Sequence, residues 1–202
     1  LVTVCEESRV PWVAIGRGSN LLVADEGYPG VVITLGRDFR ICRYDEDAHS
    51  FCVGAGVPLS SVVQEAFRRS LAGFEFAVGT PGTVGGAAIM NAGAYGGEFK
   101  DVAESVRCLT PEGELVDVDA ERAQWSYRHS MMGEAGFVVL GATLRLAPDD
   151  PRAIRERMDD LARRRAEKQP LELPSAGSTF KRPAGFFVGQ LVQEAGLRGY
   201  RV

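Results

Sequence analysis

Two polar segments of the chain carry side chains that could act on a charged substrate. Residues 126–130 read Ser-Tyr-Arg-His-Ser, which places one permanent cation among hydroxyl groups. An arginine such as Arg128 can bind a carboxylate through two parallel hydrogen bonds, or stabilise negative charge that develops during a reaction. The same residues also fit a polar surface turn. His129 fits a hydrogen-bonded structural residue better than a general acid, so Arg128 is the candidate here.

The second polar segment, residues 174–183, reads Pro-Ser-Ala-Gly-Ser-Thr-Phe-Lys-Arg-Pro. Small residues before Ser178 would let its hydroxyl approach a ligand, and Lys181 and Arg182 could meet a phosphate or a carboxylate. Upstream, Arg164 and Lys168 lie one helical turn apart and form a positive patch on one helix face. The alternatives are a turn or helix cap for the first group and a solvated helix face for the second.

Two glycine-rich segments complete the candidate chemistry. Residues 79–97 contain seven glycines and no acidic or basic side chain, and residues 16–20 read Gly-Arg-Gly-Ser-Asn. Neither matches a dinucleotide-binding fingerprint or a P-loop, because Leu21 stands where the third glycine belongs and no Gly-Lys-Ser/Thr follows. A tight turn or close backbone packing would also need glycine. Together, however, the two segments favour backbone N–H groups that converge on a diphosphate.

The elements that must position these groups alternate between strands and helices, so the fold class is α+β. The expected strands are residues 12–15, 21–23, 31–35, 39–44, 51–53, 102–109, 115–118 and 137–146, with 39–44 and 51–53 forming a hairpin around an acidic turn. The expected helices are the second half of one at 1–9, one that starts near Pro58, one at 150–167 and one at 185–195. Buried stripes are Val62, Val63, Ala66 and Phe67 in the second helix, and Ile154, Met158 and Leu161 in the third. A proline-bounded extended link covers 169–174.

Composition narrows the function classes. The net charge of −4 over 202 residues argues against a nucleic-acid partner, since no basic excess exists to meet a phosphate backbone. The four cysteines are scattered and only two histidines accompany them, so neither a disulfide framework nor a structural metal site is expected. We expect reduced core cysteines in a cytoplasmic protein, with no membrane segment and no signal peptide. Both chain ends look cut.

Taken together, five segments resemble the UDP-N-acetylenolpyruvoylglucosamine reductases, flavoenzymes of bacterial peptidoglycan precursor synthesis. The segments are residues 16–23, 79–86, 91–96, 127–130 and 174–183, in family order, and the last is similar to the shorter subtype. The resemblance implies an FAD-binding domain of the vanillyl-alcohol-oxidase (PCMH) type in two subdomains. These would be residues 1–37 and 38–147, followed by part of an α+β substrate-binding domain at 148–202.

The resemblance also implies the roles of the site residues. FAD would bind non-covalently along Gly16, Gly18, Ser19, Asn20, Gly79, Thr80, Pro81, Gly82, Gly85, Gly86, Asn91 and Ala92. NADPH would act as co-substrate and reduce the flavin, which would then pass hydride to the enolpyruvyl ether of the UDP-sugar. Arg128 matches the arginine that steadies the resulting enediolate, and Ser178 matches the proton donor. Arg164, Lys168 and Arg182 are candidates for the phosphates of the UDP-sugar.

One family residue has no counterpart in the chain. The third catalytic residue, a glutamate, would lie beyond Val202, so we expect weak or no turnover from these 202 residues alone. We further expect a monomer with only small-molecule partners. Two other readings stay open: another flavoprotein oxidoreductase of the same FAD fold, and a non-catalytic flavin-binding fragment. Sugar and alcohol oxidases often tether the flavin through His or Cys, and neither residue occurs in the glycine-rich segments.

Overall fold

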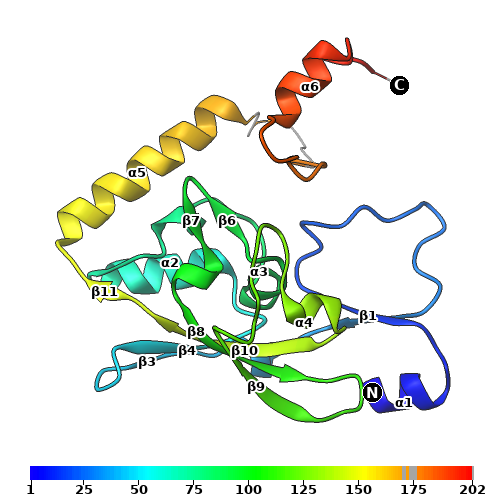
Figure 1. Cartoon of the computed structure of the whole chain (residues 1–202). Helices are drawn as coiled ribbons and strands as arrows, with labels where there is room; N and C mark the ends of the chain where they lie inside the picture. Colours follow the sequence, from blue (N-terminus) through cyan, green and yellow to red (C-terminus); the bar gives the residue numbers. More distant parts are fainter. Residues whose placement is uncertain (170–171, 173–176, 202) are drawn as a thin grey trace. The chain divides into compact units, whose positions relative to one another are not determined.

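The computed structural model describes residues 1–169, 172 and 177–201. Its largest sheet among these residues has five antiparallel strands (Figure 1). The strand order is β3-β4-β10-β8-β9, and each neighbouring pair is antiparallel. The strands are β3 (Cys42–Asp45), β4 (Ser50–Gly54), β8 (Ala103–Leu109), β9 (Leu115–Asp119) and β10 (Val138–Arg145). The hairpin and the three later strands were predicted within a few residues, and the α+β fold class is confirmed.

Alternating side chains build the core on one face of this sheet. In β4, Phe51 and Val53 are buried while Cys52 between them is exposed, which is the period-two pattern of a half-buried strand. Helix α2 (Leu59–Arg68) contributes Leu59 and its neighbours to the same core, and the predicted stripe of Val62, Val63 and Ala66 is buried, with Phe67 packed beside it. Pro58 is the N-cap of this helix, as expected from the missing N–H of proline.

A separate pair of parallel strands, β1 (Trp12–Ile15) and β2 (Val31–Thr34), lies near the N-terminus. The strand predicted at 21–23 is wrong: Leu21, Leu22 and Val23 form no strand, and Leu22 is 94% exposed. The physical reason is pairing, because β1 pairs directly with β2 and leaves the segment between them without a strand neighbour. Helix α1 (Val2–Glu7) precedes β1, as the sequence suggested.

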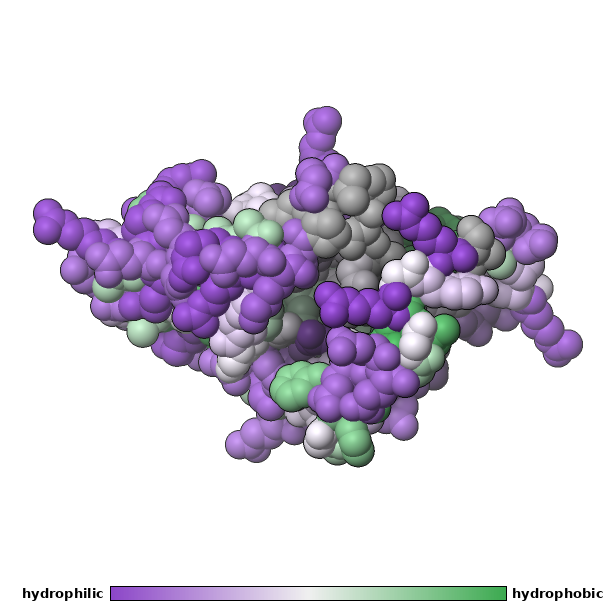
Figure 2. All heavy atoms as spheres, turned by 90° about the horizontal axis from the view of Figure 1, so that it is seen from above, coloured by the Kyte–Doolittle hydropathy of each residue, from purple (hydrophilic) through white to green (hydrophobic). Residues whose placement is uncertain are grey.

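Helix α5 (Pro151–Lys168) follows the short strand pair of β5 (Leu71–Ala72) and β11 (Ala147–Pro148). Its predicted stripe is confirmed, with Ile154 and Met158 buried and Leu161 half-buried. Its remaining surface is charged, and hydrophilic side chains predominate on the face shown in Figure 2. The other short elements are η1 (Arg37–Phe39), η2 (Glu75–Ala77), α3 (Val84–Met90), β6 (Gly93–Ala94), β7 (Gly97–Glu98), η3 (Phe99–Asp101) and α4 (Met131–Glu134).

The chain divides into two compact units, Leu1–Lys168 and Gln169–Val202. The second unit contains α6 (Val188–Glu194), which starts later than the helix predicted at 185–195. It ends at Glu194, with Ala195 as its C-cap, just before Gly196, whose φ of +71° suits glycine. The predicted link at 169–174 lies outside the described residues except for 169 and 172.

All four cysteines are free thiols, but they do not share one environment. Cys5 and Cys108 are buried, and burial raises the pKa of the Cys108 thiol to about 12, with a smaller contribution from Asp117. Cys42 is half-buried. The expectation of core cysteines is wrong for Cys52, because it occupies the outward position of β4. Among the described residues, every helix is too short or too polar to span a lipid bilayer.

Candidate functional site

The two glycine-rich segments lie side by side in the first unit. A Cβ atom added at Gly16 would come within 2.5 Å of the Thr83 Oγ1 atom, so these two loops are in direct contact. A Cβ atom added at Gly82 would lie 3.5 Å from Ser19 Oγ. Residues 16–20 therefore face residues 79–83, and their role as two walls of one binding site stays a prediction.

The middle of the longer segment is a helix, α3, which is not among the helices expected from the sequence. The N–H groups of Val84 and Gly85 donate to the carbonyl oxygens of Val57 and Ala55, at 3.0 and 2.9 Å, so these two groups are engaged within the protein. A Cβ atom at Gly85 would lie 2.9 Å from the Ala55 Cβ atom, which explains glycine by close packing. Burial of Val84 outweighs the low helix propensity of glycine.

The exposed part of the two segments has the chemistry of an anion-binding cradle. Gly18, Gly79 and Gly82 have φ angles of +69°, +69° and +128°, a region that favours glycine. Around Gly18, no described atom lies within 4 Å of an added Cβ atom, which leaves open space on that wall. The hydroxyls of Ser19 and Thr80 and the backbone N–H groups are donors, and no acidic side chain occurs in either segment. These residues fit the diphosphate of a dinucleotide.

The remaining predicted cofactor residues differ in exposure. Asn20, Pro81 and Gly86 are exposed, and Ala92 is half-buried. Asn91 is completely buried. Its amide Nδ2 donates to Glu98 Oε2 at 3.0 Å and to the Ser126 carbonyl oxygen at 3.1 Å, and its Oδ1 accepts from the Lys100 N–H at 3.0 Å. The Asn91 side chain therefore binds protein groups on both sides of its amide.

Arg128 lies on a tight turn that contacts residues 91 and 93 of the longer glycine-rich segment. Reciprocal backbone hydrogen bonds of 3.2 Å between Ser126 and His129 close the turn. The Arg128 guanidinium donates to the Gly93 carbonyl oxygen at 2.8 Å and to the Asn91 carbonyl oxygen at 3.3 Å. The predicted cation is thus half-buried and lies against the backbone of residues 91–93. His129 lies 3.7 Å from Glu134 in a surface pair, which fits its structural reading.

Arg165, which α5 directs at the cradle, is a further candidate that was not predicted from the sequence. Its Nη2 atom donates to Thr80 Oγ1 at 3.1 Å, and its Cδ atom would lie 2.8 Å from a Cβ atom at Gly79. Its guanidinium carbon lies 5.9 Å from the centre of the Tyr95 ring, within range of a cation–π contact. The predicted Arg164 instead pairs with Asp160 at 2.7 Å.

A sequence signal for Arg165 did exist. Position 165 lies four residues after Leu161 and seven after Met158, so it continues the buried stripe of the helix. A positive residue in line with a buried stripe points toward the protein, whereas Arg164 lies one position off that line. Lys168, at the end of α5, is exposed.

Ser178, Lys181 and Arg182 belong to the second unit and are all exposed. The guanidinium carbon of Arg182 lies 5.3 Å from the centre of the Phe187 ring. Residues 174–176 of the predicted motif lie outside the described residues. A meeting of Ser178 with Arg128 therefore stays a prediction.

Comparisons with known proteins agree with this arrangement. Residues 1–119 match the FAD binding domain family, and residues 169–202 match the C-terminal domain of UDP-N-acetylenolpyruvoylglucosamine reductase. The reductase of Agathobacter rectalis is 47% identical over all of this chain and 68% of its own length. Those of Syntrophomonas wolfei and Streptococcus pneumoniae strain JJA are 47% and 45% identical, over 98% and 100% of this chain, and 66% of their own lengths.

Solved structures give the same grouping. The crystal structure of UDP-N-acetylenolpyruvylglucosamine reductase (MurB) from Thermus caldophilus has a TM-score of 0.85 and 38% identity, covering 98% of this chain and 71% of that one. A glucose dehydrogenase, a variant of Phl p 4, shares the fold with a TM-score of 0.56 and 20% identity, covering 74% of this chain and 32% of its own. This chain spans about two thirds of the length of its curated relatives. It belongs to the UDP-N-acetylenolpyruvoylglucosamine reductase family.

Proposed function

We propose that the protein reduces UDP-N-acetylenolpyruvoylglucosamine to UDP-N-acetylmuramate, with FAD as cofactor and NADPH as reductant. The observation that carries the proposal is the contact between residues 16–20 and 79–83, within the part that matches the FAD binding domain family. The names of its relatives supply the substrate and the reaction class. The reaction takes place in the cytoplasm, in a monomer.

The glycine-rich segments hold the cofactor non-covalently. Gly16, Gly18, Gly79 and Gly82 let the backbone approach the diphosphate, while the hydroxyls of Ser19 and Thr80 donate hydrogen bonds to it. Neither segment contains the His or Cys that a covalent flavin link needs. The remaining residues proposed along the cofactor are Asn20, Pro81, Gly85, Gly86, Asn91 and Ala92, with Gly85 acting through its packing because its N–H is engaged.

Bound FAD supplies a hydride acceptor for NADPH and then a hydride donor for the enolpyruvyl double bond. Arg128 contributes by binding the substrate carboxylate, where negative charge accumulates as the double bond is reduced. Its guanidinium is permanently charged and already oriented by two backbone carbonyl groups, so little reorganisation is needed. Ser178 donates the proton to the α-carbon, and it is exposed in the second unit.

Three cations are proposed for the phosphates of the UDP-sugar: Arg164, Lys168 and Arg182. Arg164 and Lys168 lie near the C-terminal end of α5. In this proposal residues 1–37 and 38–147 are the two subdomains that bind FAD, and residues 148–202 bind the substrate. The 202-residue chain by itself is proposed to bind FAD and to turn over weakly or not at all.

A flavin titration with one matched pair of variants tests the cofactor part. Purified apo-protein should quench the fluorescence of added FAD. Ser19→Ala should weaken binding by about tenfold or more, because a hydrogen bond to a charged oxygen contributes about 1.5–3 kcal/mol. Ser105→Ala removes a hydroxyl from β8, inside the five-stranded sheet and outside both segments, and should leave affinity unchanged. Absence of FAD binding by the parent protein, or equal loss in both variants, would overturn the assignment.

A further inference from the structure

Arg128 has an unusual backbone conformation for its residue type. Its φ angle is +56°, at the third position of the turn formed by residues 126–129, where glycine is the usual residue. A large side chain is held there only at a cost in free energy, and such strain gathers at functional sites. The turn therefore needs neighbours that hold it in place.

Asn91 contacts this turn at two points. Its side-chain Nδ2 donates to the carbonyl oxygen of Ser126, the first residue of the turn, at 3.1 Å. Its own backbone carbonyl accepts from the Arg128 Nη1 atom at 3.3 Å. One residue thus touches both the base of the turn and the charged end of the arginine. Asn91 is itself in the left-handed region, with φ of +41°, at the C-cap of α3, and its side chain is fully buried.

Glu98 fixes the orientation of that amide. The carboxylate Oε2 accepts from Asn91 Nδ2 at 3.0 Å, while the Lys100 N–H donates to Asn91 Oδ1 at 3.0 Å. A flipped amide would place its oxygen against the carboxylate and against the Ser126 carbonyl oxygen, so one orientation is selected. Lys100 Nζ lies 2.9 Å from the same carboxylate. The pKa of Glu98 is held below its usual value by this contact first, and then by the Asn91 hydrogen bond and the nearby Arg128 charge.

We propose that Asn91 and Glu98 are positioning residues, which set the place and direction of the Arg128 guanidinium. This rests on the proposed function, since it concerns the residue that binds the substrate carboxylate there. Neither residue need touch the reacting atoms. The contacts run from the Glu98 carboxylate to the Asn91 amide, and from there to the turn and the guanidinium.

The simpler alternative is that Asn91 only ends helix α3, because asparagine often occupies a left-handed C-cap. Asn91→Gly separates the two roles. Glycine adopts the same φ without strain and keeps the carbonyl group that accepts from Arg128, but it lacks all three amide hydrogen bonds. A pure C-cap role predicts no change in catalysis by this variant, whereas the positioning role predicts a specific loss.

The experiment uses the protein extended to the full length of its relatives and loaded with FAD. The two half-reactions are followed separately: bleaching of the flavin by NADPH, and its recolouring by UDP-N-acetylenolpyruvoylglucosamine without oxygen. Asn91→Gly should slow the second rate about a hundredfold more than the first, as misplacement of a catalytic group by about 1 Å does. Glu98→Ala should slow the second in the same direction, and Glu98→Gln, which retains an acceptor oxygen for Asn91, should recover most of the rate.

A double variant and a matched control complete the test. Adding Asn91→Gly to Arg128→Ala should cause no further slowing of the flavin recolouring, because Asn91 acts through Arg128. Glu104→Ala also removes an ion-paired glutamate, the partner of Arg145, and should have no effect on either half-reaction. Should Asn91→Gly fail to fold, the Glu98 pair carries the same prediction.

Two outcomes overturn the inference, and a third concerns the proposed function instead. A folded Asn91→Gly or Glu98→Ala protein with a normal second half-reaction contradicts it, as does slowing that adds to that of Arg128→Ala. If Arg128→Ala itself leaves the second half-reaction unchanged, the role proposed for Arg128 fails, and the positioning role falls with it.

Discussion

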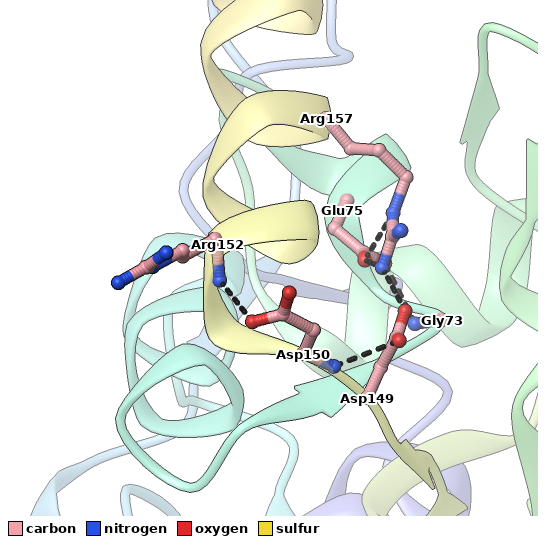
Figure 3. Close-up of polar contacts among 6 residues, drawn as sticks. All are labelled: Gly73, Glu75, Asp149, Asp150, Arg152 and Arg157. Atoms are coloured by element: carbon pink, nitrogen blue, oxygen red, sulfur yellow. Dashed lines mark hydrogen bonds and ion pairs between the residues drawn. The ribbon is translucent and has the colours of Figure 1, made fainter.

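Arg157 and Glu75, 82 positions apart in the chain, form a two-pronged ion pair: the Arg157 Nε and Nη2 atoms lie 3.0 and 2.8 Å from Glu75 Oε1 (Figure 3). The second Glu75 oxygen accepts the Gly73 N–H at 2.6 Å, and Arg157 also reaches Asp149 at 2.6 Å. The pair anchors α5 on the segment that leads into the cradle. Arg165 lies eight residues further along the helix, about 12 Å by helical rise. The anchor therefore helps to bring Arg165 over Thr80.

Arg157→Ala should destabilise the first unit. It leaves the nearly buried Glu75 carboxylate with only its backbone partner, which costs about 1–3 kcal/mol. Urea unfolding of the chain measures the loss. Arg163→Ala, an exposed arginine on the same helix with surface partners, should change stability by less than about 0.5 kcal/mol. Equal effects of the two substitutions would contradict a special role for the Glu75 pair.

Gly85→Ala and Gly86→Ala should have opposite effects on stability, although the glycines are adjacent in α3. The new methyl group at Gly85 would lie 2.9 Å from the Ala55 Cβ atom, and such overpacking costs about 1–3 kcal/mol. At Gly86 the nearest atom is 3.9 Å away, so alanine should stabilise the helix by about 0.5–1 kcal/mol. Thermal unfolding of the apo-protein distinguishes the two signs. A stabilised Gly85→Ala protein would refute the packing explanation.

Arg165→Met should weaken FAD binding about five- to tenfold, because it removes a charge-assisted contact at Thr80 while keeping most of the side-chain volume. Arg163→Met, on the same helix but paired with Asp160 and Glu167, provides the matched control and should bind FAD normally. Fluorescence titration gives both affinities. Unchanged binding in the Arg165 variant would restrict this arginine to a structural contact.

Acid should remove part of the stability through Glu98 and Asp149. The folded-state pKa of Glu98 is lowered from its ordinary value of 4.5, mainly by Lys100 and then by Asn91. The folded-state pKa of Asp149 is lowered from its ordinary value of 3.8 by Arg157. A depressed carboxyl pKa contributes stability above the unfolded pKa, and this contribution is lost as pH falls through the folded value. Urea midpoints measured from neutral pH down to about 3 should therefore decline less steeply in Glu98→Gln. An identical decline in variant and parent would argue against the Glu98 contacts.

Elements with a clear apolar period could be predicted from the sequence. Phe51 and Val53 mark a strand, and Ile154 and Met158 mark the buried face of α5. Helix α3 was missed because Gly85 and Gly86 hide its period, and only contact with Ala55 and Val57 explains why it forms. The apolar run at Leu22 was misread for the opposite reason, since no strand lies beside it. Local pattern cannot supply either fact.

The same distinction between local sequence pattern and contacts of distant positions applies to the candidate site. Gly18 and Gly82 stand out in the sequence as members of glycine-rich segments, and Arg128 as part of a motif that resembles that of a family; their binding roles stay predictions. Arg165 was not predicted, because the spacing of Arg164 and Lys168 was weighed above the buried stripe that Arg165 continues. The contacts of Asn91 with Glu98 and Ser126 join positions 7 and 35 residues apart. No spacing rule predicts them.

The central claim is that this chain carries the FAD site and the carboxylate-binding arginine of a UDP-N-acetylenolpyruvoylglucosamine reductase. Its most direct test is an anaerobic spectrum of the FAD-loaded protein, extended to the length of its relatives, after NADPH and then after the enolpyruvyl substrate. We predict that NADPH bleaches the flavin band and that the substrate restores it, with Arg128→Ala losing only the restoration. Bleaching that the substrate never reverses, or a protein that holds no flavin, would contradict the claim.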